Sequence, residues 1–574
     1  MPIRLVSPHG GSLVDLLASP DRADELRKLA LEWPTWVLTQ RQLCDLELLA
    51  SGGFSPLQGF LGEADYATVC QTMRLSDGTL WPLPITLDVA ADVAAALDAG
   101  RQLALRDPEG VLRAAIEVAE VYRPDRVAEA EAVYGTTDPA HSGVAALLAA
   151  PPFCVAGRLE VVAMPEHYDH RPLRRTPAEL RAEFRRRGWE RVVAFNTRNP
   201  MHRAHVELTR RAMAETGGAL LLHPVVGESV PGDIDHFTRV RCYEAVLPSY
   251  PQGRAMLALL PLAMRMAGPR EALWHAIIRQ NHGASHFVVG RDHAGPPARP
   301  DGVPFYPPYA AQELLARHAE ELDIALLTSG ELAYAPELDA FVAAGEVPAG
   351  TRVLAISGSE QRRRLAAGED LPSWFTVPEV AAELRRRYPP RSRQGFTVFL
   401  TGLSGAGKST VANVLRIKLL ELGGRPVTLL DGDLVRRHLS SELGFSRDHR
   451  DLNVRRVGFV ASEITRNGGA ALCALIAPYQ GPRQEVREMV ESAGGFVLVH
   501  VATGIEVCEQ RDRKGLYARA RAGLLPEFTG VSDPYEVPAD AELVIDTAEE
   551  SAEQAADRII AHLRAEGYLG GARD

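Results

Sequence analysis

The 574-residue sequence has few cysteines, and no two of them have the spacing of a metal site. A chain of this length needs no disulfide bridges for stability, so its six cysteines are expected to be reduced and mostly buried. No apolar run approaches the ~18 residues that a membrane-spanning helix requires. The N-terminus also lacks the charged and then apolar pattern of a signal peptide. These absences predict a cytoplasmic protein with no membrane association.

An excess of positive charge is missing as well, because the formal net charge is -11. The sequence therefore gives no reason to expect a nucleic-acid partner. Arg-rich stretches at 185–187, 362–364 and 385–387 are short, and their Glu and Leu neighbours indicate solvated helix faces. Repeats and low-complexity tracts are also absent. What remains is typical of a globular protein, with 46% hydrophobic and 24% charged residues. At ~100–200 residues per domain, three or four domains are expected.

Three regions differ in pattern. Residues 1–165 mix short apolar runs with frequent Gly and Pro, which predicts short strands, turns and a few helices such as residues 20–33. Strand-like and helix-like segments alternate through residues 166–390, which predicts a parallel sheet covered on both faces. A Pro-rich, polar linker lies at 389–395, and a second alternating pattern fills residues 391–574.

A Gly-rich loop opens the third region. Its sequence, GLSGAGKST at 402–410, follows a β-type apolar run and precedes a helix-compatible stretch that starts at Lys408. In this context backbone N–H groups turn around phosphate oxygens, Lys408 reaches the outer phosphates and Ser409 can reach Mg²⁺. The predicted ATP-binding residues are Gly402, Gly405, Ala406, Gly407, Lys408, Ser409 and Thr410.

Polar residues further along indicate an anionic acceptor. Asp431 and Asp433 follow a predicted strand, where they could orient or deprotonate an acceptor hydroxyl or help to hold Mg²⁺. A solvated turn is the alternative for this pair. The positive charges and amide donors at 450–456 suit an anion. Loop-like segments at 514–517 and 528–530 could close as a lid.

Together these features make residues 396–570 resemble adenylylsulfate kinase (APS kinase). That family transfers the γ-phosphate of ATP to the 3′-hydroxyl of adenosine 5′-phosphosulfate (APS). The resemblance implies that Asp433 is the acceptor-side carboxylate and that Lys514 and Phe528 close over the substrates. The implied APS-binding residues are Asp431, Arg436, Phe445, Arg450, Asn453, Ile476, Lys514 and Phe528.

Three positions depart from the kinase family. Ala477 stands where some members have a serine that carries phosphate, so direct in-line transfer is predicted here. His449 replaces the usual Asp, and Leu434 replaces a common Asn. Neither change removes a group of the Gly-rich loop.

A second polar segment, FNTRNPMHRAH at 195–205, follows a predicted strand and opens a helix. His202 and His205 can point the same way at the start of that helix. Zinc would require a third and a fourth ligand at a suitable spacing, and none lies nearby, so no zinc is expected. A clamp for the β- and γ-phosphates of ATP fits better. A pair of satisfied core histidines is the alternative reading.

A comparable strand end at 288–295 again carries Gly, Arg and His, as a nucleotide cleft requires. With both segments, residues 1–388 resemble ATP sulfurylase, a nucleotidylyltransferase with a His-x-x-His phosphate site. The match includes GFSPL at 53–57, PITLD at 84–88 and ISGS at 356–359. An α/β protein is therefore predicted, with a mostly β, PUA-like N-terminal domain, a Rossmann-like nucleotidylyltransferase domain and a C-terminal P-loop NTPase kinase domain.

The sulfurylase family joins sulfate to the AMP moiety of ATP and releases pyrophosphate. The resemblance implies a catalytic trio, in which Arg198 holds sulfate: Thr197, Arg198 and Asn199. The other implied ATP- and sulfate-binding residues are Asn196, His202, His205, Gly290, Arg291, Asp292, His293, Ala294 and Ala333. Asn196 replaces a Gln that is one methylene longer, which predicts a weaker or re-aimed contact. Ser359 replaces a common Thr and keeps its hydroxyl.

The two resemblances predict two-step sulfate activation, in which ATP and sulfate give APS and pyrophosphate, and ATP and APS then give phosphorylated APS (PAPS) and ADP. Mg²⁺ bound with ATP is the expected cofactor. The expected partners are ATP, sulfate, APS and further copies of the chain, because the family forms dimers or hexamers.

Three alternatives stay open. The C-terminal domain could be an allosteric sensor of PAPS or APS, the sulfurylase could run in reverse to make ATP, or the P-loop domain could act on another metabolite. The intact Lys408, Ser409, Asp431 and Asp433 argue against a sensor.

Overall fold

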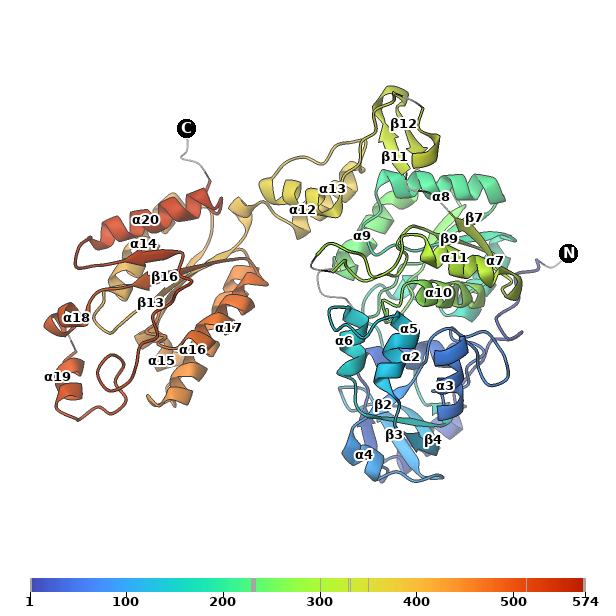
Figure 1. Ribbon diagram of the computed structural model, residues 1–574, viewed down its shortest axis with the longest axis horizontal. Coiled ribbons are helices and arrows are strands. Elements are labelled where there is room, and N and C mark those ends of the chain that lie inside the picture. The colour runs from blue at the N-terminus through green and yellow to red at the C-terminus, as the bar shows by residue number, and fades with distance from the viewer. Residues whose placement is uncertain are drawn as a thin grey trace. The chain divides into compact units, whose positions relative to one another are not determined.

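The computed structural model describes residues 3–228, 234–299, 301–328, 330, 332–348, 350–512 and 514–570 (Figure 1). The chain divides into two compact units. Unit 1 comprises Met1–Ser357 and Leu371–Leu384, and unit 2 comprises Gly358–Asp370 and Arg385–Asp574. Within the described ranges, no helix combines the length and the apolarity that crossing a membrane requires. The domain boundaries near 165 and 390 stay predictions.

The N-terminal part of unit 1 is built on a five-stranded sheet in the order β1-β3-β4-β5-β2. Its strands are β1 (Thr35–Val37), β2 (Leu87–Val89), β3 (Gln102–Arg106), β4 (Leu112–Tyr122) and β5 (Phe153–Val161). Only β1 and β3 pair in parallel among the five, and the other neighbours are antiparallel. The accompanying helices are α1 (Pro20–Leu29), α2 (Gln40–Ala50), α3 (Glu63–Thr72), α4 (Ala91–Ala95), α5 (Arg126–Tyr134) and α6 (Ser142–Leu148).

The second part of unit 1 is a parallel sheet in the order β10-β9-β6-β7-β8. The strands are β6 (Val192–Phe195), β7 (Ala219–Leu222), β8 (Ala255–Leu257), β9 (His286–Val289) and β10 (Ala325–Thr328). The helices are α7 (Pro177–Arg187), α8 (Arg203–Thr216), α9 (His236–Val246), α10 (Pro269–Asn281), α11 (Ala310–Arg317) and α13 (Pro378–Arg387), which crosses the boundary between the units. Because β6 has β7 on one side and β9 on the other, the order of strands reverses at β6 and β9. Ligands of such sheets bind at the carboxyl ends of the strands, at this switch point.

A hairpin of β11 (Leu332–Ala335) and β12 (Ala340–Ala343) follows the parallel sheet. Figure 1 places it beside α8, and the two elements contact each other. The hairpin also holds Tyr334, whose ring stacks on Trp374 at 5.2 Å between centroids. This stacking joins the hairpin to the segment Leu371–Leu384 of the same unit.

Unit 2 is a second parallel sheet, in the order β14-β15-β13-β16-β17. The strands are β13 (Phe396–Thr401), β14 (Val427–Asp431), β15 (Ala470–Ala474), β16 (Gly495–Val501) and β17 (Leu543–Ile545). The helices are α12 (Gly358–Ala367), α14 (Lys408–Leu422), α15 (Gly432–His438), α16 (Arg447–Arg466), α17 (Gln480–Glu491), α18 (Ile505–Arg511), α19 (Leu516–Arg521) and α20 (Ala552–Ala565).

Two helix layers cover the two faces of this sheet. Successive side chains of a strand point to opposite faces. Val398 and Leu400 of β13 accordingly belong to the core under α14 and α20, whereas Phe399 belongs to the core under α16 and α17. Figure 1 shows these two helix pairs on opposite sides of the sheet. The loop between β13 and α14 is thereby held at the carboxyl edge of a strand that is buried on both faces.

Candidate functional site

In unit 1, the segment after β6 and the segment after β9 lie at the switch point of the parallel sheet, because the two strands pair directly. Thr197 Oγ1 accepts the backbone N–H of Asn199 at 3.1 Å, which turns the chain after β6. Arg198 reaches across to the second segment, where its Nη1 donates to the carbonyl oxygen of Gly295 at 3.0 Å. The structure therefore brings the predicted catalytic trio and the predicted ATP segment together.

The segment after β9 adopts a tight loop. Asp292 and Ala294 both have positive φ angles, of 53° and 55°. Residues other than glycine seldom adopt this conformation, and such strain is concentrated at functional sites. The loop is held by the N–H of Asp292, which donates to Pro308 at 2.9 Å, and by the carbonyl of Ala294, which accepts from Gly268 at 3.1 Å. Gly290 begins this loop, and a Cβ added to it would meet no atom within 4 Å. Arg291 is exposed and paired with Asp292.

His202 and His205 stand at the start of α8. The backbone N–H of His202 donates to Nδ1 of His205 at 3.1 Å. Burial lowers the pKa of His205 to about 4, so its ring is neutral at pH 7. A neutral ring that accepts at Nδ1 carries its proton on Nε2, where it can donate to a phosphate oxygen. His202 stacks on Phe375, with ring centroids 4.2 Å apart.

Two further residues complete the predicted sulfurylase set. The Oδ1 atom of Asn196 is buried and has no hydrogen-bond partner among the residues that the structure describes. A buried acceptor of this kind costs free energy unless something satisfies it, so a bound substrate is the partner we expect. Ala333 lies on β11 of the hairpin, opposite Val342. Within the described ranges, no group of three or more His, Cys, Asp or Glu side chains is arranged to hold a metal ion.

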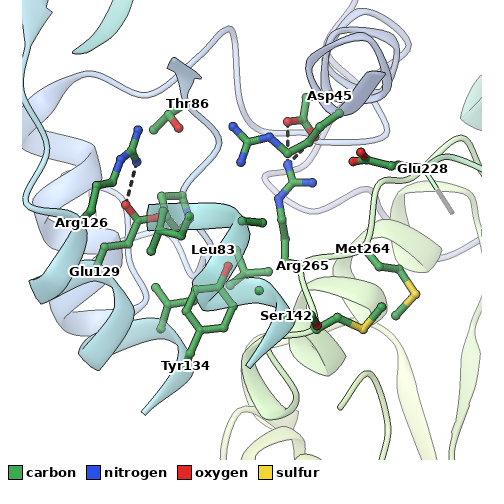
Figure 2. Close-up of a pocket in the computed structure, with 17 residues that line it drawn as sticks. Asp45, Leu83, Thr86, Arg126, Glu129, Tyr134, Ser142, Glu228, Met264 and Arg265 are labelled. Carbon is green, nitrogen blue, oxygen red and sulfur yellow. Dashed lines mark hydrogen bonds and ion pairs between the residues drawn. The ribbon is translucent and has the colours of Figure 1, made fainter. Parts of the chain in front are cut away.

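A cavity of about 180 Å³, lined by both apolar and charged side chains, lies beside this site (Figure 2). It is bordered by both parts of unit 1 and reaches Met266, whose Sδ lies 3.2 Å from Nη1 of Arg198. Arg265 and Asp45 both line this cavity. The guanidinium of Arg265 donates two hydrogen bonds to the carboxylate of Asp45, at 2.7 and 2.6 Å. Both side chains of this ion pair are almost completely buried.

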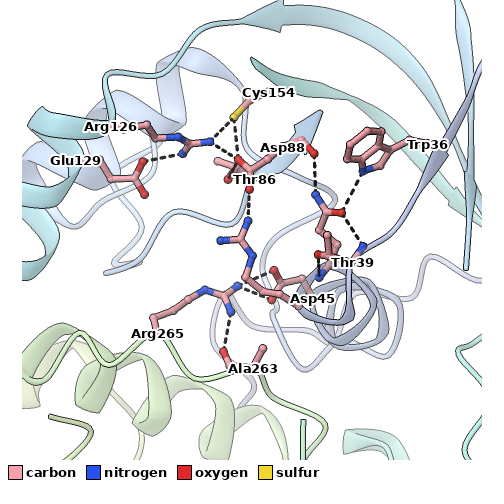
Figure 3. Close-up of polar contacts among 12 residues, drawn as sticks. Trp36, Thr39, Asp45, Thr86, Asp88, Arg126, Glu129, Cys154, Ala263 and Arg265 are labelled. Atoms are coloured by element: carbon pink, nitrogen blue, oxygen red, sulfur yellow. Dashed lines mark hydrogen bonds and ion pairs between the residues drawn. The ribbon is translucent and has the colours of Figure 1, made fainter. Parts of the chain in front are cut away.

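A second buried ion cluster adjoins the first (Figure 3). Asp88 accepts hydrogen bonds from Arg41, Arg126 and Thr86, and the thiol of Cys154 donates to it at 3.3 Å. Burial raises the pKa of Asp88, but the two guanidinium groups outweigh that effect and lower it. Sequence reasoning noticed Thr86 and Asp88 only as part of a family motif. The structure shows that Asp88 is the centre of a buried ion cluster and that Thr86, which donates to it, also lines the cavity.

In unit 2, the loop after β13 has the backbone that a phosphate cradle needs. Gly402, Gly405 and Gly407 have φ angles of 151°, 78° and 98°. A side chain at Gly402 would meet the carbonyl oxygen of Val501 at 2.4 Å, so no larger residue fits there. Ala406 is buried and its carbonyl accepts from Thr547 at 2.9 Å, which ties the loop to the segment after β17. Thr410 is exposed in the first turn of α14.

Lys408 begins α14 and folds back over the loop. Its Nζ donates to the carbonyl oxygens of Gly402 and Leu403, at 2.9 and 2.7 Å. Burial lowers the pKa of Lys408 to about 8. The next residue, Ser409, donates from Oγ to Oδ2 of Asp431 at 2.5 Å. This hydroxyl and carboxylate form the kind of oxygen-donor pair that binds Mg²⁺.

Asp433 and Lys514 form an exposed ion pair at the edge of this loop. Asp431 caps α15 by accepting the N–H of Asp433 at 3.1 Å. Arg436 lies on α15, with its guanidinium carbon 4.5 Å from the ring centroid of the exposed Phe445. The Oδ1 atom of the buried Asn453 has no hydrogen-bond partner among the described residues. Ile476 follows β15, and its carbonyl accepts from Thr401 at 2.6 Å.

Arg450 has a different environment from its predicted neighbours, because it is buried and fully bonded within unit 2. It donates to the carbonyl oxygens of Phe445 and Glu527, both at 2.8 Å. It also donates to Thr529 at 2.7 Å and to Asp533 at 2.8 Å. Arg450 thus joins α16 to the segment that contains Phe528. Phe528 itself packs edge-on against Tyr517 at 5.1 Å, and the Tyr517 hydroxyl donates to Ser404 of the phosphate loop.

The three departures from the kinase family also have defined positions. Ala477 has a φ angle of 43°, and its carbonyl accepts from Arg483 at 2.7 Å. His449 accepts the backbone N–H of Gly444 at Nδ1, at 2.9 Å, as a carboxylate at this position could. Leu434 is exposed on α15.

Two nucleotide-type sites on two parallel sheets define the class of the protein as a nucleotidyltransferase fold joined to a P-loop kinase fold. Comparison with protein families agrees with this class. The description "PUA-like domain" matches residues 6–164, "ATP-sulfurylase" matches residues 171–387 and "Adenylylsulphate kinase" matches residues 394–546. The predicted fold class is therefore confirmed.

Known proteins match along the whole chain. A sulfate adenylyltransferase of Phaeosphaeria nodorum is 52% identical over 98% of this chain and 99% of its own length. That of Emericella nidulans is also 52% identical, with the same coverage. A solved structure titled a hexameric APS kinase from Thiobacillus denitrificans is 40% identical, covers 99% of this chain and 100% of its own, and has a TM-score of 0.82. The chain belongs to the sulfate adenylyltransferase family. It is an enzyme that carries an ATP sulfurylase domain and an APS kinase domain.

Proposed function

We propose that this chain activates sulfate in two steps. In the first, a sulfate oxygen attacks the α-phosphorus of ATP, the bond to the β-phosphate oxygen breaks, and APS and pyrophosphate form. In the second, the 3′-hydroxyl of APS attacks the γ-phosphorus of another ATP, and PAPS and ADP form. One observation supports this function best, namely that the same chain contains both sites. Thr197, Arg198 and Asn199 lie at the switch point between β6 and β9, and a glycine-rich phosphate loop that ends in Lys408 and Ser409 follows β13.

The proposed sulfurylase step needs positioning and charge rather than a covalent intermediate. Arg198 is held by Gly295 and Met266, and its guanidinium is the positive charge that we assign to the sulfate ion. The Nε2–H of His205 would donate to a phosphate oxygen as charge moves onto the leaving pyrophosphate. We assign Thr197, Asn199, His202 and the loop from Gly290 to Ala294 to the same substrates.

The proposed kinase step uses the loop glycines and Lys408 around the phosphates, and Asp433 at the acceptor hydroxyl. ATP phosphates would replace the carbonyl oxygens that Lys408 now contacts. The hydroxyl of Ser409 and the carboxylate of Asp431 would hold Mg²⁺. The ion would neutralise charge on the phosphates. Ala477 has no hydroxyl, so the phosphoryl group passes directly from ATP to APS.

We also propose that the enzyme is cytoplasmic and forms a homo-oligomer. All six cysteines are buried free thiols, which is typical of a reducing compartment. The relative titled a hexameric APS kinase spans the whole chain, which supports an assembly of several copies. We assign no nucleic-acid or membrane partner to the chain.

Product analysis of the whole protein with ATP, Mg²⁺ and sulfate tests this function. PAPS together with ADP is expected from the native chain, and APS without PAPS from a Lys408→Ala variant. APS alone from the native chain would show that unit 2 is a sensor. No adenylated product from either protein would overturn the sulfurylase assignment.

A further inference from the structure

Helix α10 carries a stripe of ionisable residues through the interior of unit 1. Glu271, His275 and Arg279 recur every four residues, so they share one face of the helix. All three side chains are fully buried. Burial of charge costs free energy unless it is paired or serves a function. Neither the catalytic trio nor the phosphate clamp includes this stripe.

The middle of the stripe touches the loop after β9. Nδ1 of His275 and Nε2 of His293 share a hydrogen bond of 3.0 Å. The ring of His293 is also packed edge-on against Phe287, with centroids 5.5 Å apart. Gly268, the residue before α10, also holds this loop, because its N–H donates to the carbonyl oxygen of Ala294 at 3.1 Å. The orientation of His293 is therefore determined by α10 as much as by its own loop.

The protons on this pair of rings can be placed. Burial lowers the pKa of His275 and of His293 well below the usual value, so both rings are neutral and each carries one N–H. Their shared hydrogen bond allows two arrangements, with both protons on Nε2 or both on Nδ1. Arg279, the next charge on the stripe, donates to the backbone of His275 and His223 rather than to either ring.

Glu271 decides between the two arrangements. Its Oε1 lies 3.5 Å from Nε2 of His275, and that nitrogen has no hydrogen-bond partner among the described residues. A carboxylate at this distance attracts an N–H and repels a nitrogen lone pair. Burial raises the pKa of Glu271 above its ordinary value. The backbone N–H groups of Arg265 and Ala267, which donate to its two oxygens at 2.9 Å, act against that rise and favour the ionised form. The proton of His275 therefore lies on Nε2. Its Nδ1 is then the acceptor of the shared hydrogen bond, so the proton of His293 lies on Nε2 as well.

We propose that Glu271 and His275 are positioning residues of the sulfurylase site, which hold His293 as the tautomer that presents an unprotonated Nδ1 to ATP. In this form His293 accepts a hydrogen bond from an O–H or N–H group of the nucleoside and makes no contribution of charge to the phosphates. The inference rests on the proposed sulfurylase function and adds to it a means of recognising the nucleoside.

The tautomer can be measured without activity, by long-range proton–nitrogen NMR of the whole protein labelled with ¹⁵N-histidine. The signals of His293 are identified by their loss in a His293→Gln variant. We expect a pyridine-type shift for Nδ1 and a pyrrole-type shift for Nε2. The opposite pattern would show that Glu271 is protonated and that the chain of hydrogen bonds runs in reverse, which would overturn the proposal.

Kinetics supply the second test. His275→Asn should raise the KM for ATP in APS synthesis by about tenfold, the effect of one lost hydrogen bond, and change kcat much less. Glu271→Gln should do the same, because its amide N–H can donate to Nε2 of His275 and reverse both tautomers. The kinase rate with supplied APS should stay unchanged in both variants.

His282→Asn is the matched control, since His282 is buried at the end of α10, where its ring bonds to the carbonyl oxygen of Ile278 and packs against the ring of His223. An equal rise in the KM for ATP in this control would mean that any cavity left by a smaller side chain near α10 has the same effect. That result would refute the positioning role. A native enzyme that makes no APS would refute the proposed function instead, while the NMR result would still report on the tautomer.

Discussion

The guanidinium of Arg198 donates a 3.0 Å hydrogen bond to the carbonyl oxygen of Gly295, so a residue that follows β6 is fixed by a residue of the loop that follows β9. The bond spans the switch point of the parallel sheet, where β6 and β9 pair. The position of the proposed sulfate-binding group is therefore set by two loops that are 97 residues apart in the sequence.

Arg198→Ala should abolish most APS synthesis. Removal of one preorganised hydrogen-bond donor from an enzyme site lowers kcat by about 10²–10³-fold. PAPS formation from supplied APS should stay at the native rate, because unit 2 contains its own site. The check is a coupled assay of each half-reaction. Arg254→Ala is the control, since Arg254 bonds to Gly217 and Gly218 away from the trio, and an equal loss there would contradict a specific role.

ATP binding by the kinase site should weaken above about pH 8. Burial lowers the pKa of Lys408 to about 8, so the ammonium loses its proton as the pH rises through that value in the free enzyme. The KM for ATP in the kinase reaction should then increase by up to about tenfold per pH unit. Arg stays charged over this range, so Lys408→Arg should show a flat profile even if its rate is low. Parallel profiles for the two proteins would rule out Lys408 as the titrating group.

The same shift affects stability with the opposite sign. The unfolded chain keeps the ordinary lysine pKa of 10.5 and binds more protons than the native chain between pH 8 and 10.5. The contribution of Lys408 to the stability of unit 2 should therefore rise with pH across that window. Denaturant unfolding in the absence of nucleotide, with Lys408→Met as the reference, measures this difference.

Breaking the Asp45–Arg265 pair should destabilise unit 1 strongly. Asp45→Asn leaves the buried guanidinium of Arg265 without its charged partner, at a cost of about 3–5 kcal/mol. The double variant Asp45→Leu with Arg265→Met should recover much of this loss, because no charge stays buried. Tryptophan fluorescence follows the unfolding of unit 1 alone, since all six tryptophans lie in its segments. The exposed pair of Arg74 and Glu321 is the comparison, and Arg74→Ala should cost no more than about 1 kcal/mol.

Arg450→Ala should loosen the segment that carries Phe528. The side chain of Arg450 connects α16 to Glu527, Thr529 and Asp533, and charge-assisted bonds of this kind contribute about 1.5–3 kcal/mol each. Faster hydrogen exchange at 527–533 and a higher KM for APS are expected. Arg455→Ala removes an exposed ion pair of the same helix and should change neither. If the Arg450→Ala variant kept the native rate of hydrogen exchange at 527–533 but had a higher KM for APS, Arg450 would contact APS directly.

The elements that could be predicted from the sequence are those set by local pattern. The β-type run before the phosphate loop is β13, and α14 begins at Lys408 as expected. The strand expected before the segment at 195–205 is β6, a short and fully buried run. The helix expected at 20–33 ends earlier, at Leu29.

The contacts that could not be predicted join residues far apart in the chain. Nothing near His202 indicates that Phe375 stacks on it, and nothing near Arg450 indicates its bonds to Thr529 and Asp533. The stripe on α10 did leave a signal, namely polar residues every fourth position in an apolar stretch. That signal has chemical meaning only once the fold places His293 against it.

The two units are interleaved along the chain, because Gly358–Asp370 belongs to unit 2 whereas the following Leu371–Leu384 belongs to unit 1. No single breakpoint between residues 357 and 385 keeps both units whole. A break at the linker of residues 389–395 would consequently separate α12 from the rest of unit 2, and a break after Ser357 would remove the segment with Phe375 from unit 1. Exchange of one catalytic half between members of this family therefore requires compensating changes on both sides of the junction, which favours inheritance of the two halves together.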